Sequence, residues 1–102
     1  MVSARTSGWK FKQGQGEETL KTLESKISGE ARGTRGYRGS LVLQSVEDPN
    51  AGTIITKWED EKTLRESAAG VFKDAAREIK KFTAAPPDVK NHKIFGADLV
   101  LV

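Results

Sequence analysis

The sequence predicts an α+β fold in which a four-stranded antiparallel sheet carries two helices. Short segments rich in β-forming residues are separated by two longer segments in which apolar residues recur at helical spacing. The segments follow the order strand, helix, strand, strand, helix, strand, which is typical of the ferredoxin-like βαββαβ arrangement. Right-handed crossovers would place both helices on one face of the sheet. At 102 residues we expect one domain spanning residues 1–102.

The first strand and the first helix are predicted in the N-terminal third. Residues 3–12 hold Trp9 and Phe11 at period two, and a glycine-rich turn follows. A helix is expected from residue 17 to about residue 33, where two glutamates in the first turn suit the positive end of the helix dipole. Its apolar face consists of Leu20, Leu23, Ile27 and Ala31.

The second half of the chain is predicted to hold a hairpin, a helix and a last strand. Residues 38–46 and 53–59 are rich in β-forming residues and flank a turn that contains Asp-Pro-Asn. A long helical region is expected over residues 64–82, with Gly70 as a break and two prolines beyond its end. Residues 89–102 are expected to form a strand and an apolar tail.

Both faces of this sheet are predicted to be partly apolar. Neighbouring positions on a strand point to opposite faces, and apolar residues occupy neighbouring positions at Leu41, Val42 and Leu43 and at Ile54 and Ile55. Two helices cover only one face, so a second copy of the chain is the simplest cover for the other. We therefore expect a homodimer formed through the sheet faces and through the apolar tail, residues 99–102.

Composition excludes several functional classes. The chain has no cysteine, which excludes disulfides, thiolate catalysis and cysteine metal sites. Its 17 basic and 14 acidic residues are interspersed, so no nucleic-acid-binding stripe is expected. No apolar run approaches the roughly 20 residues of a membrane span, and the first residues do not form a signal peptide. We expect a cytoplasmic protein without a membrane partner.

Three segments together carry a resemblance to a known family. They are KFKQG at 10–14, GYRGSLVL at 36–43 and WEDE at 58–61. In sequence and spacing they resemble the antibiotic-biosynthesis-monooxygenase family across nearly the whole chain. The resemblance implies that two ferredoxin-like subunits pair sheet to sheet into a dimeric α+β barrel. It also implies a ligand pocket between the sheet and the helices of each subunit.

The resemblance implies different outcomes for the two known activities of this family. Haem-degrading members use a histidine and a tryptophan on the second helix and an asparagine on the first strand; the matching positions here are Ala76, Glu66 and Ser7. Haem degradation is therefore not expected, and no cofactor is predicted.

Members that oxidise polycyclic phenols without a cofactor carry a tryptophan at the end of the third strand, which Trp58 matches. Their polar partners are replaced here by Ile54 and Leu64. The expected function is that of a cofactor-independent monooxygenase-like protein that acts on or binds a small planar aromatic compound. A non-catalytic carrier or sensor of small ligands is the alternative.

The candidate catalytic base is His92, the single histidine, because an imidazole titrates near neutrality. Its alternative role is that of a solvated residue at the sheet edge. No metal site is expected, because one histidine without cysteine leaves carboxylates to supply every other ligand.

The candidate pocket residues are Trp58, Phe72 and Tyr37. Packing in the core is the more usual role of the first two, and the Tyr37 hydroxyl could reach solvent or a ligand. Three arginines, Arg5, Arg38 and Arg77, could hold an anionic substrate, although solvated surface charge is the usual role of such residues.

RNA binding is a further alternative, because the RNA-recognition motif shares this order of elements. Residues 35–39, RGYRG, are similar to the aromatic stacking strand of that motif. That strand is the third one in the motif, whereas this segment follows the first helix, and further aromatic residues for base stacking are missing. Nucleic acid is therefore not an expected partner.

Overall fold

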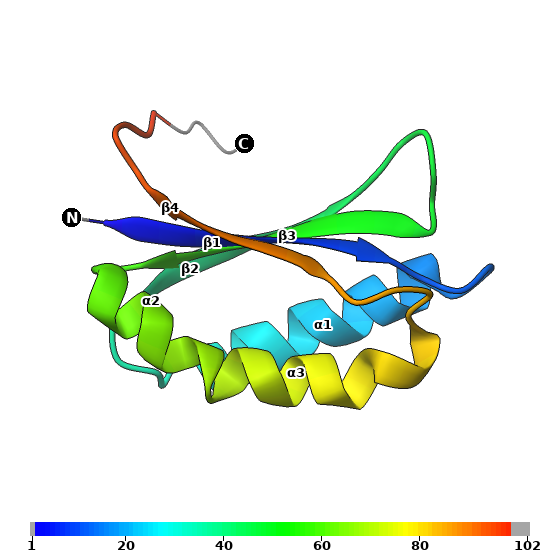
Figure 1. Ribbon diagram of the computed structural model, residues 1–102, viewed down its shortest axis with the longest axis horizontal. Coiled ribbons are helices and arrows are strands. Elements are labelled where there is room, and N and C mark those ends of the chain that lie inside the picture. The colour runs from blue at the N-terminus through cyan, green and yellow to red at the C-terminus, as the bar shows by residue number, and fades with distance from the viewer. Residues whose placement is uncertain (1, 99–102) are drawn as a thin grey trace.

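The elements of the chain follow the predicted order. The structure is a computed structural model that describes residues 2–98, and the tail predicted to help dimerisation, residues 99–102, lies outside that range. The elements are β1 (Ser3–Lys10), α1 (Gly16–Ala31), β2 (Tyr37–Gln44), β3 (Ala51–Trp58), α2 (Glu61–Ala68), α3 (Val71–Ile79), the 3₁₀ turn η1 (Lys80–Phe82) and β4 (Asp88–Lys93) (Figure 1).

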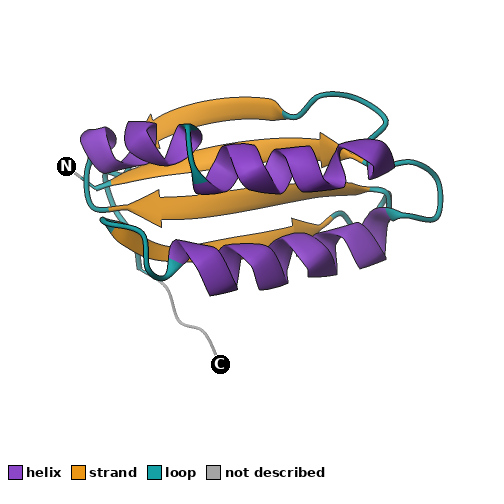
Figure 2. Ribbon diagram, turned by 90° about the horizontal axis from the view of Figure 1, so that it is seen from below, coloured by secondary structure: helices purple, strands orange, loops and turns teal. Residues whose placement is uncertain are grey.

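The four strands form one sheet in the order β2-β3-β1-β4, and every neighbouring pair is antiparallel. The helices lie on a single face of this sheet, with α2 and α3 following one another in a row beside α1, as Figure 2 shows from the helix side. The predicted ferredoxin-like α+β fold is confirmed. Within residues 2–98, no helix is long and apolar enough to cross a membrane.

The long helical region divides where the glycine was expected to interrupt it. Gly70 is the N-cap of α3, with φ −115° and ψ −105°, so α2 and α3 are separate helices. The region also starts three residues before the predicted residue 64. Asp60 ends the preceding segment as an N-cap: its carboxylate accepts a hydrogen bond of 2.8 Å from the backbone N–H of Thr63. A cap of this kind satisfies an N–H group of the first turn that has no helical partner.

The hydrophobic core lies between the helices and the sheet. The alternate residues of each central strand that face the helices are buried, as the period of two requires. The core cluster consists of Trp9, Phe11, Leu20, Leu23, Ile27, Ala31, Ile54, Ala75 and Ile79. Every apolar residue predicted for the face of the first helix belongs to this cluster, which confirms that face.

We call the opposite face of the sheet the outer face, and no helix of residues 2–98 covers it. Leu41 pairs with Ile55 and Leu43 pairs with Thr53, so both leucines point away from the helices. They are 39% and 44% exposed. The expectation that both faces are partly apolar is therefore confirmed.

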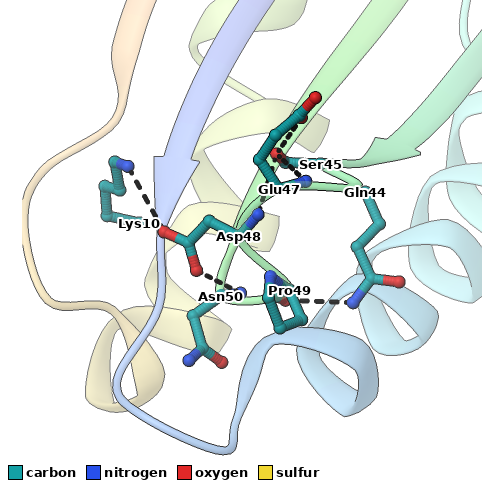
Figure 3. A network of polar contacts seen from close by, with 7 residues as sticks. All are labelled: Lys10, Gln44, Ser45, Glu47, Asp48, Pro49 and Asn50. Carbon is teal, nitrogen blue, oxygen red and sulfur yellow. Dashed lines mark hydrogen bonds and ion pairs between the residues drawn. The ribbon is translucent and has the colours of Figure 1, made fainter.

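The β2–β3 hairpin loop is tied to the end of β1 and to the start of α1 by polar contacts, part of which Figure 3 shows. The Lys10 ammonium lies 3.6 Å from the Asp48 carboxylate. The Asn50 side chain accepts a hydrogen bond from the Gly16 N–H at 3.2 Å. A Cβ at Gly16 would come 2.0 Å from the Pro49 carbonyl oxygen, so only glycine permits this close approach.

Candidate functional site

A small cavity lies between the inner face of the sheet and the helices α1 and α3. Three aromatic side chains form much of its wall, from Trp9, Trp58 and Phe72; we call it the aromatic cavity. The remaining lining is aliphatic except for three polar residues, Arg5, Ser7 and Thr56. The free space is about 20 Å³, room for little more than one water molecule. In this conformation the cavity is closed to a larger ligand.

Both tryptophans of the chain line this cavity, and each is held by its own strand. The Trp9 indole N–H donates to the Ser7 hydroxyl at 2.8 Å, and the Trp58 indole N–H donates to the Thr56 hydroxyl at 2.9 Å. In each case the acceptor lies two residues earlier, on the same face of the strand. Ser7 and Thr56 therefore satisfy the buried indoles and orient them toward the cavity.

The charged group of the cavity is the Arg5 guanidinium, on a residue only 3% exposed. It donates to the Ser67 hydroxyl at 2.9 Å and to the Leu64 carbonyl at 2.6 Å. Its central carbon lies 4.9 Å from the Phe72 ring centroid, a cation–π distance. Burial lowers the pKa of Arg5 below its usual value, and no carboxylate within residues 2–98 forms an ion pair with it.

Two of the predicted pocket residues meet in this cavity, and the third lies behind it. Trp58 and Phe72 both line the cavity, from β3 and from the first turn of α3. Tyr37 contacts the Trp58 ring edge-on, with centroids 5.6 Å apart, and its hydroxyl donates to Ser40 at 2.9 Å. Tyr37 thus supports the cavity wall and is not part of the lining.

The structure places His92 away from the aromatic cavity. His92 pairs with Ala4, the neighbour of Arg5, and therefore points to the outer face. Its ring nitrogen Nε2 lies 3.0 Å from the Thr6 hydroxyl, in an exposed contact. The expectation that His92 shares a pocket with Trp58 and Phe72 is corrected, because the pairing of β4 with β1 puts it on the opposite side of the sheet.

Arg5 has a larger role in the cavity than the sequence alone indicates. The sequence left two roles open for all three arginines, holding an anionic substrate or acting as solvated surface charge, and the other two have the second role. Arg38 and Arg77 have largely exposed side chains and lie 3.6 Å from Glu59 and 3.9 Å from Asp74. The available signal was the period of two in β1, which puts Arg5 on the same face as the buried Trp9.

The fold and the cavity define a ferredoxin-like α+β protein with an aromatic-walled cavity between sheet and helices. Residues 7–82 match the sequence profile of the antibiotic biosynthesis monooxygenases. The chain belongs to the antibiotic biosynthesis monooxygenase family, as the resemblance in its sequence predicted. No curated protein sequence gives a significant match.

Solved structures of the same fold cover nearly the whole chain. A protein of unknown function from Nitrosomonas europaea has a TM-score of 0.77 at 16% identity, covering 99% of this chain and 96% of its own. A conserved protein from Methanosarcina mazei has a TM-score of 0.76 at 17% identity, with 91% and 92% covered. SnoaB, a cofactor-independent oxygenase from Streptomyces nogalater, has a TM-score of 0.76 at 11% identity, with 94% and 95% covered. Likeness at these identities establishes the shared fold.

Proposed function

We propose that this member of the family binds a small planar aromatic compound in the aromatic cavity, as a cofactor-independent monooxygenase-like protein. The observation that carries the proposal is the wall formed by Trp9, Trp58 and Phe72 around an apolar interior with few polar groups. Flat aromatic ligands are recognised by sites of this composition, because aromatic faces bury their area and a few polar groups fix their orientation. SnoaB, which shares the fold, is a cofactor-independent oxygenase and supports the same class.

Binding requires the cavity to open, because about 20 Å³ cannot hold an aromatic ring. Phe72 is the wall residue best placed to move. It is only partly buried and lies in the first turn of α3, directly after the break at Gly70. The first turn of α3 is therefore the proposed entry. Its displacement would widen the cavity and separate Phe72 from Trp9, whose ring centroid lies 6.3 Å away, while both tryptophans keep the hydrogen bonds within their own strands.

The lining of the cavity favours binding over a complete catalytic site. Within the described lining no carboxylate or imidazole is present, so no side chain there acts as a general base. Deprotonation of a bound phenol would depend on the acidity of the ligand itself or on solvent. This observation favours the second candidate function, a non-catalytic carrier or sensor that uses the same cavity.

We further propose that the outer face pairs with a second copy of the chain. Leu41, Leu43 and Ile55 occupy neighbouring places on that face, and a contiguous apolar sheet surface is usually covered by a partner. Sedimentation at micromolar concentration should give about twice the chain mass of 11.2 kDa. Introduction of a charge by Leu41→Lys should shift the protein toward the monomer. A monomer in the unaltered protein would refute the pairing.

Tryptophan emission tests ligand binding directly, since both tryptophans line the cavity. Titration with anthrone should change that emission in a saturable way, and Phe72→Ala should alter the affinity. Tyr37→Phe is the matched control, because its ring lies behind Trp58 and outside the lining. Oxygen uptake in the same samples separates the two candidates: uptake supports the monooxygenase, and saturable binding without uptake supports the carrier. Absence of any saturable change with anthrone and similar tricyclic phenols would overturn the proposal.

A further inference from the structure

Arg5 is the only ionisable residue in the described lining of the aromatic cavity. A cation in an apolar interior is costly unless a negative charge accompanies it. Its hydrogen-bond acceptors, the Ser67 hydroxyl and the Leu64 carbonyl, are both neutral. The structure thus contains a buried positive charge that no carboxylate within residues 2–98 balances.

The contacts of Arg5 also leave it free to accept a new partner. Each of the two terminal nitrogens of a guanidinium carries two N–H groups. Each of these nitrogens donates one hydrogen bond here, which leaves N–H groups available for a new acceptor. The Ser67 hydroxyl in addition donates to the Leu64 carbonyl at 2.6 Å. If the guanidinium turns toward the cavity, the Ser67 hydroxyl and the Leu64 carbonyl remain hydrogen-bonded to each other. The rearrangement therefore leaves no buried polar atom without a hydrogen bond.

We propose that the ligand of the aromatic cavity carries an anionic oxygen, as a carboxylate, phenolate or enolate, and that Arg5 binds this oxygen while the ring lies against Trp58 and Phe72. The inference rests on the proposed function, binding of a planar aromatic compound, and adds the charge of that compound. Charge-assisted hydrogen bonds from arginine to an anionic oxygen are among the stronger polar contacts in proteins, and the dry surroundings strengthen this one. Arg5 is therefore the residue that determines specificity for an anion.

The competing explanation is that Arg5 only holds α2 to β1 through Ser67 and Leu64. An arginine with only this structural role would affect the affinities for neutral and anionic ligands equally. The ratio of two affinities measured on one protein sample separates these roles, because any change in cavity shape or folding cancels in the ratio.

Calorimetric titration with 2-naphthoate and 2-naphthamide at neutral pH supplies that ratio, since the two probes have the same ring and differ in charge. The unaltered protein should bind naphthoate about 10- to 100-fold more tightly than naphthamide. Arg5→Met should bring the ratio to about one or below, and Arg5→Lys should keep part of the preference. Arg38→Met, which removes an exposed arginine outside the cavity, should leave the ratio unchanged.

Each outcome has a definite meaning. Equal binding of both probes by the unaltered protein overturns the anion proposal and leaves aromatic binding standing. A preference for naphthoate that persists in Arg5→Met assigns the anion site elsewhere and also overturns it. Failure of both probes to bind, while anthrone still changes tryptophan emission in a saturable way, overturns the anion proposal alone. Failure of anthrone and similar tricyclic phenols as well refutes the proposed function itself. If Arg5→Met does not fold, the ratio in the unaltered protein and in Arg5→Lys still decides the question.

Discussion

Replacing Arg5 by methionine should change the free energy of unfolding by about 2 kcal/mol or less, although the residue is 3% exposed and makes two buried hydrogen bonds. Methionine fills much of the volume of the arginine stem and has no polar atom to satisfy. The Ser67 hydroxyl and the Leu64 carbonyl remain bonded to each other at 2.6 Å, so no buried acceptor is left alone.

The size of this change in the free energy of unfolding follows from two opposing contributions. Two hydrogen bonds from a charged donor contribute about 3 to 6 kcal/mol together, and the cation–π contact with Phe72 adds about 1 kcal/mol. Against this, burying a guanidinium without a carboxylate costs several kcal/mol. The difference is about 2 kcal/mol or less in either direction. Arg5→Ala should cost more, because it also leaves an unfilled space beside the aromatic cavity.

Urea unfolding followed by tryptophan emission measures this difference. The protein concentration is held fixed, because the proposed dimer would make stability depend on concentration. Arg38→Met is the control for removing an exposed arginine and should stay within about 0.5 kcal/mol of the unaltered protein. A loss above about 4 kcal/mol in Arg5→Met would refute the reasoning. It would show that Arg5 is primarily a structural link between β1 and α2.

Three further outcomes are expected. Gly16→Ala should destabilise the protein by roughly 1 to 3 kcal/mol in urea unfolding, because the new Cβ would lie 2.0 Å from a loop carbonyl. In the same helix a Cβ at Gly29 would meet no atom of residues 2–98 within 4 Å, so Gly29→Ala should stabilise the protein by about 0.5 to 1 kcal/mol. Hydrogen bonds from the Thr63 backbone and hydroxyl lower the pKa of Asp60; its stabilising effect is therefore present above the unfolded pKa of about 3.9 and is lost as the pH falls through the lower folded value. The difference in urea midpoint between the unaltered protein and Asp60→Asn should accordingly narrow in acid, and a constant difference from pH 7 to pH 2 would contradict the assignment. Haem should give no histidine-ligated Soret spectrum, because Ala76 stands where haem-degrading relatives are implied to carry their ligand, and a histidine-dependent spectrum would show that this match of positions is wrong.

The order of the elements, their approximate bounds and the family were predictable from the sequence alone. The reason is that these properties are local. Each signal lies within one segment and can be recognised without knowing what that segment packs against. The signals are the period of two in β1, the helical spacing in α1 and the break at Gly70. The two-sided apolar character of the hairpin strands is local in the same sense, because neighbouring residues on a strand always point to opposite faces.

The composition of the site was decided by tertiary structure. Strand periodicity predicts that Arg5 and Trp9 share a face of the sheet. Which of the two faces the helices cover depends on how the strands pair and cross over. The register of β4 against β1, with His92 opposite Ala4, sends the only histidine to the outer face. The same packing brings Ser67 and Leu64, about sixty residues away along the chain, to the Arg5 guanidinium. Long-range pairing of this kind is set by the combined burial of many side chains, so no single segment of the sequence contains it.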